Sequence, residues 1–218
     1  MTNRTLVVSI DALITADIPV LKQLPNLGRV MEHASWITDI ECIYPTLTYP
    51  CHATIATGCW PDRTGINNNE IPDFFAKGRM DWYWWREAIQ VPTVVDFARQ
   101  AGLTASTVTW PVMCASGAEY NIGEIWAPRE EDDPTPWFTR ANSPAVAKIF
   151  EANKHMLRWM KTPQMDEFAA KCAADIIRAH RPDLMLLHLS YVDHQRHRLG
   201  VHGDLEHAFR FIDGQMGL

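Results

Sequence analysis

The sequence lacks CxxC pairs, and its five cysteines, at positions 42, 51, 59, 114 and 172, form an odd set without regular spacing. This pattern argues against a zinc knuckle and gives no indication of a disulfide framework. Reduced thiols in the cytoplasm are therefore the expectation that follows from the cysteines. The sequence also has no internal repeat and no low-complexity tract.

Long apolar runs and an excess of basic charge are missing as well. No apolar run approaches the length of a membrane span, and the first residues lead into a short apolar run without the core of a signal peptide. The net charge of −6 and the pI near 5.8 argue against binding along a nucleic-acid backbone. We therefore expect neither a nucleic-acid polymer nor a membrane as partner, and the sequence does not indicate an oligomeric state.

The chain has 47% hydrophobic residues among its 218, which is enough for a sizeable core. Short apolar runs, of the kind that lie buried in a parallel sheet, predict strands at 5–10, 35–40, 104–109 and 184–190. Apolar residues at helical spacing predict helices at 94–101, at 146–160 and after Pro163. This alternation predicts an α/β fold, with a mainly parallel sheet and helices on both of its faces.

The composition divides the chain into three parts. Residues 1–117 and 164–218 are expected to form the α/β domain, whereas 118–163 are expected to form an inserted segment resembling a lid or cap. This segment contains an acidic, proline-rich run at 130–136, for which a surface loop without a role in the site is an equal alternative. Helical apolar spacing still runs through the last residues, so we expect the natural protein to continue beyond them.

Two polar residues lie where ligands are expected to bind in the predicted fold. Asp11 follows the first predicted strand, and ligands of open α/β sheets gather beyond the carboxyl ends of strands. Thr48 precedes Pro50, a residue favoured at the start of a helix, where free N–H groups attract phosphate. Each residue could instead cap a helix. A threonine acting as a nucleophile would need a base or a metal to activate it.

The region around Thr48 resembles the nucleophile region of the type I phosphodiesterase/nucleotide pyrophosphatase family, which belongs to the alkaline phosphatase superfamily. The resemblance covers residues 44–58 and the Trp-Pro-Asp-Arg-Thr-Gly-Ile run at 60–66. Residues 8–13 are similar to the opening motif of that family. The resemblance implies an alkaline-phosphatase-like fold, Thr48 as the nucleophile, and Asp11 and Thr48 as metal ligands. The chain departs from the family pattern at Thr64, where His is usual, and at Cys51, where Asn is frequent.

The same resemblance assigns two further residues to the site. Asn69 matches an asparagine that donates a hydrogen bond to a phosphate oxygen, although turn formation also explains asparagines in the run 67–69. Tyr49 matches an aromatic residue that can stack on a nucleobase, which makes it the expected substrate-binding residue. The aromatic run 82–85 offers another apolar wall, although most tryptophans serve packing.

Asp193 and His197 lie four residues apart, just after the last predicted strand. On a helix this spacing lets a carboxylate and an imidazole face one ion, and both are ligands of zinc. They resemble the family's Asp-x-x-Gly-His element, with Arg196 in the place of glycine. His194 and His202 are competing ligands, for which surface histidines are the alternative, and a polar strand end is the alternative for the pair itself.

Together, the residues and the resemblance predict a hydrolase of phosphodiester or pyrophosphate bonds that uses two divalent metal ions, with zinc expected, and a phosphothreonine intermediate. Its expected substrate is a small, nucleotide-like phosphate ester. The alternatives are a phosphonate or phosphomonoester hydrolase and a non-catalytic anion-binding module. A sulfatase is not expected, because its nucleophile motif is missing. No Asp-His pair follows His197, so both ligand sets are incomplete and we expect this chain alone to turn over poorly.

Overall fold

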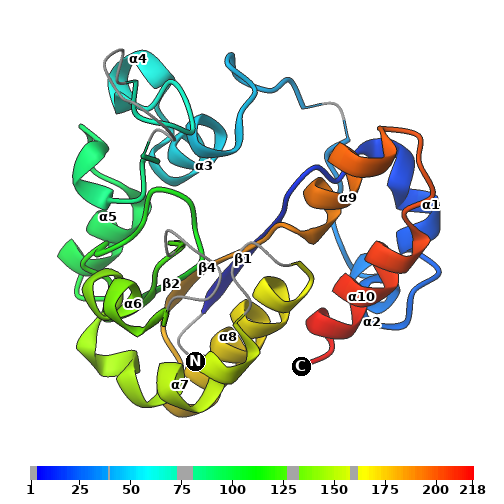
Figure 1. The fold of residues 1–218 in the computed structure, drawn as a ribbon. Helices are drawn as coiled ribbons and strands as arrows, with labels where there is room; N and C mark the ends of the chain where they lie inside the picture. The colour runs from blue at the N-terminus through cyan, green and yellow to red at the C-terminus, as the bar shows by residue number, and fades with distance from the viewer. Residues whose placement is uncertain (1–3, 39, 73–80, 127–132, 158–161) are drawn as a thin grey trace.

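The computed structural model describes residues 4–38, 40–72, 81–126, 133–157 and 162–218. At its centre is a parallel sheet of four strands in the order β1-β4-β2-β3 (Figure 1). The strands are β1 (Thr5–Ile10), β2 (Ala105–Val108), β3 (Tyr120–Ile122) and β4 (Leu184–Leu189). The predicted α/β class with a parallel sheet is therefore confirmed.

Strand β4 lies between β1 and β2, and all six of its residues are buried. Its nearly continuous apolar sequence suits a strand that is covered on both faces. It pairs with β1 in a register that runs from Thr5 opposite Leu184 to Ile10 opposite Leu189. The carboxyl ends of β1 and β4 therefore lie side by side, so that the residues that follow them meet at one edge of the sheet.

Helices pack on both faces of this sheet, with α8 on one face and α3 and α5 on the other (Figure 1). The predicted helices at 94–101 and after Pro163 are confirmed as α5 (Val94–Gln100) and α8 (Gln164–His180). Helices α3 (Thr48–Thr57), α9 (Tyr191–Leu199) and α10 (Glu206–Met216) are the other long ones. The shorter helices are α1 (Ile18–Leu21), α2 (Pro25–Met31), α4 (Pro61–Thr64), α6 (Thr135–Ala141) and α7 (Ala147–Asn153).

Short 3-10 turns complete the described elements, at Thr15–Asp17, Arg86–Ala88, Pro144–Val146 and Lys154–Met156. The helix predicted at 146–160 is therefore α7 flanked by two such turns, and residues 158–161 lie outside the described part of the chain. None of the helices in the described ranges is long and apolar enough to cross a bilayer.

The strand predicted at 35–40 is wrong. Residues 35–38 and residue 40 form no strand, and the side chains of Ile37 and Ile40 are 79% and 73% exposed. Their β-branched composition favours a strand only where a partner strand and a covering layer are present. Neither is present for this segment among the described residues.

The segment 118–163 contributes to the sheet and to the core. It contains β3, and its Phe138 and Phe150 rings stack at 5.0 Å and 19°. Both rings pack edge-on against Phe168 of α8, at 5.8 and 6.2 Å. The division of the chain into three parts, with a lid, stays a prediction, and residues 130–132 of the acidic run lie outside the described residues.

Candidate active site

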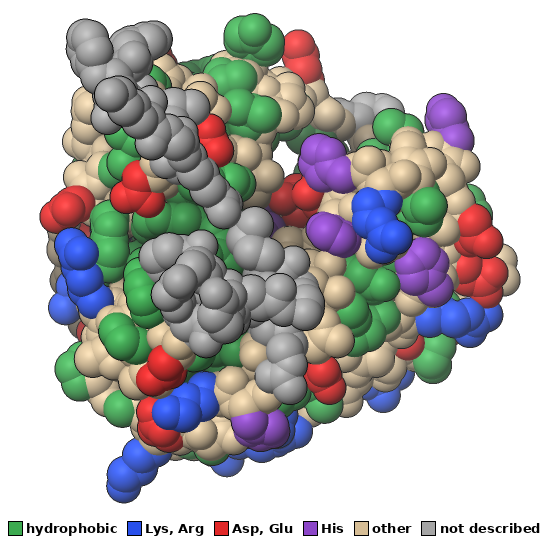
Figure 2. Space-filling view, viewed as in Figure 1, with side chains coloured by type: hydrophobic (Ala, Val, Ile, Leu, Met, Phe, Trp, Pro, Cys, Tyr) green, Lys and Arg blue, Asp and Glu red, His purple; other side chains and the backbone are tan. Residues whose placement is uncertain are grey.

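The polar residues that follow the strands meet in one cavity of about 320 Å³. Asp11 follows β1, Thr48 is the first residue of α3, and Asp193 lies on α9 just after β4. All six predicted site residues line this cavity: Asp11, Thr48, Tyr49, Asn69, Asp193 and His197. Figure 2 shows histidine side chains gathered around a hollow beside α9. Segments far apart in the sequence are thus brought together at the carboxyl edge of the sheet.

The Thr48 hydroxyl donates a hydrogen bond of 3.2 Å to Oδ2 of Asp11. His52, one turn along α3, fixes the backbone of Thr48, because its Nδ1 donates to the Thr48 carbonyl oxygen at 2.7 Å. Its Nε2 then accepts from the hydroxyl of Ser9 on β1 at 2.9 Å. Burial, followed by the charge of His188, lowers the pKa of His52 to about 3. A neutral His52 therefore holds the start of α3 against β1.

Asn69 binds the backbone of the residue after Thr48. Its Oδ1 accepts a hydrogen bond of 2.9 Å from the Tyr49 N–H, so its amide nitrogen is left to donate elsewhere. The Tyr49 N–H, at the start of α3, is thus already bonded. Asn69 nevertheless lines the cavity beside Thr48.

The ring of Tyr49 lies beneath other aromatic rings. It is 1% exposed and packs edge-on against Trp82 and Trp84, at 5.2 and 6.1 Å between ring centres. Trp82 and Trp126 line the cavity as well, and they meet each other edge-on at 5.0 Å. The role of Tyr49 in substrate binding stays a prediction, and the more accessible aromatic surfaces belong to the two tryptophans.

Asp193 and His197 face each other on α9, with 3.4 Å between Asp193 Oδ1 and His197 Nε2. The buried carboxylate of Asp166 on α8 accepts from the N–H groups of Ser190 and Tyr191, at 3.0 and 2.8 Å, and so anchors the start of α9. Burial, followed by the charge of Asp11, raises the pKa of Asp193. The two carboxylates therefore repel each other across the cavity, an arrangement that a bound cation would stabilise.

His194 also lines the cavity, whereas His202 is not among its lining residues. Arg196, in the place of the glycine usual in the family, lies buried within an unbroken α9. Its Nε donates to the carbonyl oxygen of Ala12 at 2.7 Å, and its guanidinium pairs with Asp17. The departure from the family pattern thus adds a link between α9 and the turn after β1.

Sequence reasoning missed two buried ionisable residues of the cavity, His188 and Glu124. His188 Nδ1 donates to the Thr109 carbonyl oxygen at 3.1 Å, and its Nε2 lies 3.5 Å from Asp11 Oδ2. Burial acts to lower the pKa of His188, but the bond to Asp11 and the charge of Glu124 outweigh burial and raise it to about 9. Burial raises the pKa of Glu124 to about 7.

The buried His188 also changes the pKa of Asp11. Burial tends to raise its pKa, but the bond and charge of His188 dominate and lower it to about 2, so Asp11 is ionised at neutral pH. The sequence did carry a signal for His188, since it is a polar residue inside the apolar run of β4. Glu124 had a weaker signal, because β3 before it has only three residues.

The chemistry of the donors fits a divalent metal. Carboxylate, imidazole and hydroxyl groups are ligands of zinc, and zinc sites use about four ligands, or three and a water. The described residues contain no group of three or more His, Cys, Asp or Glu side chains placed to hold one ion. The pairs Asp11 with Thr48 and Asp193 with His197 therefore supply only part of each expected site.

The parallel sheet, with this cavity at its carboxyl edge, defines an α/β protein whose candidate site lies where the strands end. The sequence profile of type I phosphodiesterases/nucleotide pyrophosphatases matches residues 5–217. The chain therefore belongs to the type I phosphodiesterase/nucleotide pyrophosphatase family, and the resemblance found in the sequence is confirmed.

Among curated relatives, venom phosphodiesterase 2 of Crotalus adamanteus is 26% identical over 206 residues, which are 89% of this chain and 21% of that protein. Human ectonucleotide pyrophosphatase/phosphodiesterase family member 1 is 24% identical over 212 residues, 89% of this chain and 18% of that protein. The chain thus spans about a fifth of the length of these relatives.

Solved structures share the fold. Phosphonoacetate hydrolase from Sinorhizobium meliloti 1021, in complex with phosphonoacetate, superposes with a TM-score of 0.68 at 18% identity, covering 99% of this chain and 52% of that one. Murine ectonucleotide pyrophosphatase/phosphodiesterase 5 gives a TM-score of 0.60 at 18% identity, covering 99% of this chain and 51% of that one.

Proposed function

We propose that the protein hydrolyses phosphodiester or pyrophosphate bonds in small, nucleotide-like substrates, with Thr48 as its nucleophile. The observation that carries this proposal is the hydrogen bond of 3.2 Å from the Thr48 hydroxyl to Asp11, inside the cavity at the start of α3. A hydroxyl bonded to an ionised carboxylate, at the edge where parallel strands end, is positioned to attack a phosphorus atom.

The reaction has two steps. The Thr48 oxygen attacks the phosphorus in line and forms a phosphothreonine, while the ester bond to the leaving group breaks and that group departs with a proton. Water then attacks the same phosphorus, which releases the phosphate product and restores the hydroxyl. Asp11 accepts the hydrogen bond that orients the Thr48 hydroxyl, and His52 holds the Thr48 backbone in place.

Two divalent cations, with zinc expected, belong to this proposal. One would be held by Asp11 and Thr48, and the other by Asp193 and His197. Such ions lower the pKa of a bound hydroxyl and stabilise the charge that develops on phosphate oxygens. Burial, followed by the charge of Asp11, raises the pKa of Asp193, and the repulsion between the two carboxylates supports bound cations in this cavity.

Asn69 and two aromatic residues of the cavity are assigned to the substrate. The Asn69 amide nitrogen is positioned to donate to a phosphate oxygen, since the Asn69 oxygen is occupied by the Tyr49 N–H. Tyr49, with Trp82 beside it, would form the aromatic wall for a planar group such as a nucleobase. An inactive form of murine ectonucleotide pyrophosphatase/phosphodiesterase 5 in complex with AMP is consistent with this substrate class. The cytoplasmic location stays a prediction.

The test compares hydrolysis of bis(4-nitrophenyl) phosphate, with and without added zinc, by the wild type, Thr48→Ala and Thr46→Ala. Thr46 is an exposed threonine two residues away, whose hydroxyl bonds the Ile43 carbonyl, so it is the matched control. We expect Thr48→Ala to lose about a thousandfold in kcat/KM and Thr46→Ala to lose little.

Full activity of Thr48→Ala would contradict the proposal. Phosphate binding by every variant without zinc-dependent turnover would instead favour the anion-binding module. A preference for phosphonoacetate or for 4-nitrophenyl phosphate over the diester would favour the phosphonate or phosphomonoester alternative.

A further inference from the structure

Two cysteines lie against each other at the entrance to α3. The Sγ atoms of Cys42 and Cys51 are 3.5 Å apart, although the residues lie on different pieces of structure. Cys42 is exposed in the irregular segment before α3, and Cys51 is half-buried in the first turn of α3, three residues after Thr48. All five cysteines are free thiols in this structure. A disulfide needs about 2.0 Å between the sulfurs, so the two Sγ atoms have to approach each other by about 1.5 Å.

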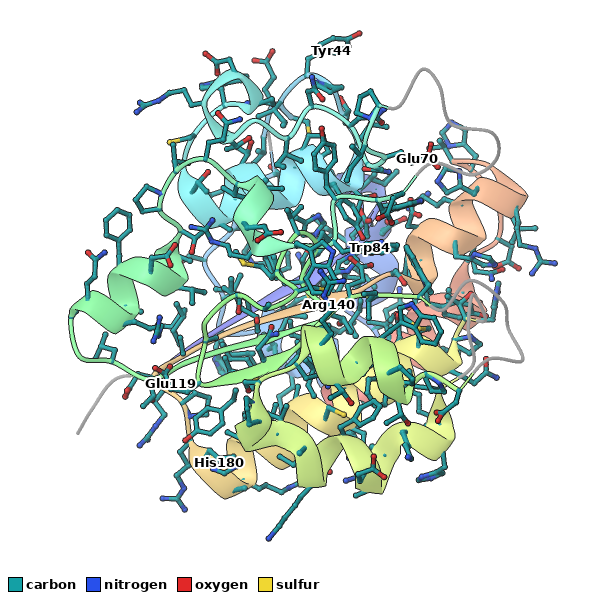
Figure 3. All side chains as sticks on the ribbon, turned by 60° about the vertical axis from the view of Figure 1, so that its left-hand side comes forward. Tyr44, Glu70, Trp84, Glu119, Arg140 and His180 are labelled. Carbon is teal, nitrogen blue, oxygen red and sulfur yellow. The ribbon has the colours of Figure 1, made fainter. Side chains whose placement is uncertain are left out.

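The segment that carries Cys42 has few other side-chain links to the rest of the protein. Within its described residues, the Thr38 carbonyl oxygen accepts from Thr15 at 2.9 Å, and Lys22 lies 5.0 Å from the ring centre of Trp36. Tyr44 is 88% exposed, and Figure 3 shows it at the edge of the molecule, pointing outward. The thiol contact therefore joins the side chains of this segment to the first turn of α3.

We propose that Cys42 and Cys51 form a reversible disulfide, with a low-molecular-weight disulfide such as oxidised glutathione as the oxidant, which fastens the segment 42–47 to the first turn of α3. This modification site goes beyond the proposed hydrolysis and does not depend on Thr48 being a nucleophile. It would close a short loop that contains Thr48, and it would thereby restrict the backbone that leads into the cavity.

The exchange proceeds in two steps. The Cys42 thiolate attacks one sulfur of oxidised glutathione, the S–S bond breaks, and one glutathione leaves as a thiolate. The Cys51 sulfur, after losing its proton to solvent, then attacks Cys42 Sγ and displaces the second glutathione. In total, the two cysteines lose two protons and two electrons, and oxidised glutathione is reduced to two thiols.

Accessibility decides the order of these steps. Cys42 is exposed and meets the oxidant first. Burial, followed by the neighbouring Cys42, raises the pKa of Cys51 to about 12, so Cys51 supplies the second sulfur rather than the first attacking thiolate. Cys59 is half-buried two residues beyond the end of α3, and it serves as the matched control.

The experiment reduces the purified chain fully and then equilibrates it in equal concentrations of reduced and oxidised glutathione. Remaining thiols, including the buried Cys114 and Cys172, are blocked with N-ethylmaleimide in urea, and peptic peptides are mapped by mass spectrometry without reductant. We expect three of the five cysteines to carry maleimide, and a cross-linked peptide pair that joins Cys42 to Cys51. The Cys59→Ser variant should form the same cross-link, whereas Cys42→Ser and Cys51→Ser should not.

The proposal is overturned if all five cysteines react with maleimide, if the cross-link joins another pair, or if only mixed disulfides with glutathione appear. Hydrogen exchange then tests whether the disulfide restricts the segment 42–47. We expect amide exchange at residues 43–47 to slow by about tenfold on oxidation of the wild type and to stay unchanged in Cys42→Ser. Equal exchange in the oxidised and reduced wild type would show that the bridge does not hold the segment.

Discussion

Arg196 Nε donates a hydrogen bond of 2.7 Å to the carbonyl oxygen of Ala12, and thereby joins α9 to the turn after β1. Ala12 has a φ of 59°, in the left-handed region that residues with a side chain rarely adopt. Because Ala12 follows Asp11 and Arg196 lies on the same helix as Asp193, the bond connects the two halves of the candidate site. The guanidinium also pairs with the buried Asp17, so its charge is compensated.

Replacing Arg196 by methionine should therefore destabilise the protein strongly. The substitution leaves the carboxylate of Asp17 buried without its partner, and we expect the free energy of unfolding to fall by about 3 kcal/mol. Urea denaturation measures this change. Arg198→Met, an exposed arginine on the same helix, should change stability by less than about 0.5 kcal/mol. Equal effects of the two substitutions would contradict the role given to Arg196.

The contacts of Asp96 make the free energy of unfolding depend on pH. It forms a capping box with Thr93 at the start of α5 and an ion pair of 2.6 Å with Arg86. Burial acts to raise the pKa of Asp96, but the bonds from Arg86 and Thr93 dominate and lower it below its ordinary value of 3.8. Because the pKa of Asp96 is lower in the folded than in the unfolded protein, the ionised carboxylate adds to the free energy of unfolding above about pH 4. This contribution is lost as the pH falls through the pKa that Asp96 has in the folded protein.

We expect Asp96→Asn to lower the free energy of unfolding by about 1 to 2 kcal/mol between pH 5 and 7. The difference from the wild type should shrink below about pH 4. Denaturant unfolding at several pH values measures both. Glu151→Gln, which removes an exposed pair with Lys154, should have little effect at any pH. A difference for Asp96→Asn that grows toward acid pH would reverse the expected sign.

Replacing Phe168 tests whether the segment 118–163 unfolds together with α8 in one cooperative transition. Its fully buried ring packs against Phe138 and Phe150 of that segment. Phe168→Ala should cost about 3 to 5 kcal/mol, and unfolding should remain a single transition by fluorescence and circular dichroism. The half-exposed Ile177→Ala on the same helix should cost far less. Two separate transitions would show that the segment folds as a lid of its own.

The metal ligands limit what this chain should do by itself. Each proposed site has two ligands among the described residues, below the usual number for zinc. We expect the 218-residue chain to bind zinc weakly in a competition assay with a chelating dye, and to hydrolyse bis(4-nitrophenyl) phosphate slowly. Asp193→Asn should weaken zinc binding further. Rapid turnover with tight zinc binding would show that the ligand sets are complete as they stand.

Much of the fold could be predicted from the sequence, because the buried strands of a parallel sheet are nearly continuous apolar runs. This holds best for β4, whereas β1 is partly exposed and β2 reads Ala-Ser-Thr-Val. The pattern failed at 35–40, where a similar composition lies exposed, since local preference does not reveal whether a partner strand is present. It also failed at β3, whose three residues are too short to stand out from the loop around them.

The six site residues were predicted from the family resemblance, together with the places of Asp11, Asp193 and His197 after strands, and the structure brings all of them to one cavity. Their electrostatic surroundings could not be predicted. His188 acts on Asp11, and Glu124 acts on His188, through burial and proximity, and these depend on how β3 and β4 are placed in the sheet. The thiol contact between Cys42 and Cys51 likewise depends on an irregular segment that no periodicity describes.

Trapping the phosphothreonine tests the central claim most directly. The zinc-loaded protein would be mixed with excess bis(4-nitrophenyl) phosphate and quenched with acid within one turnover, and its peptic peptides would be analysed by mass spectrometry. The account predicts a 4-nitrophenyl phosphoryl group on Thr48 in the wild type, and none on any residue in Thr48→Ala. Release of 4-nitrophenol without an adduct, or an adduct on another residue, would contradict it.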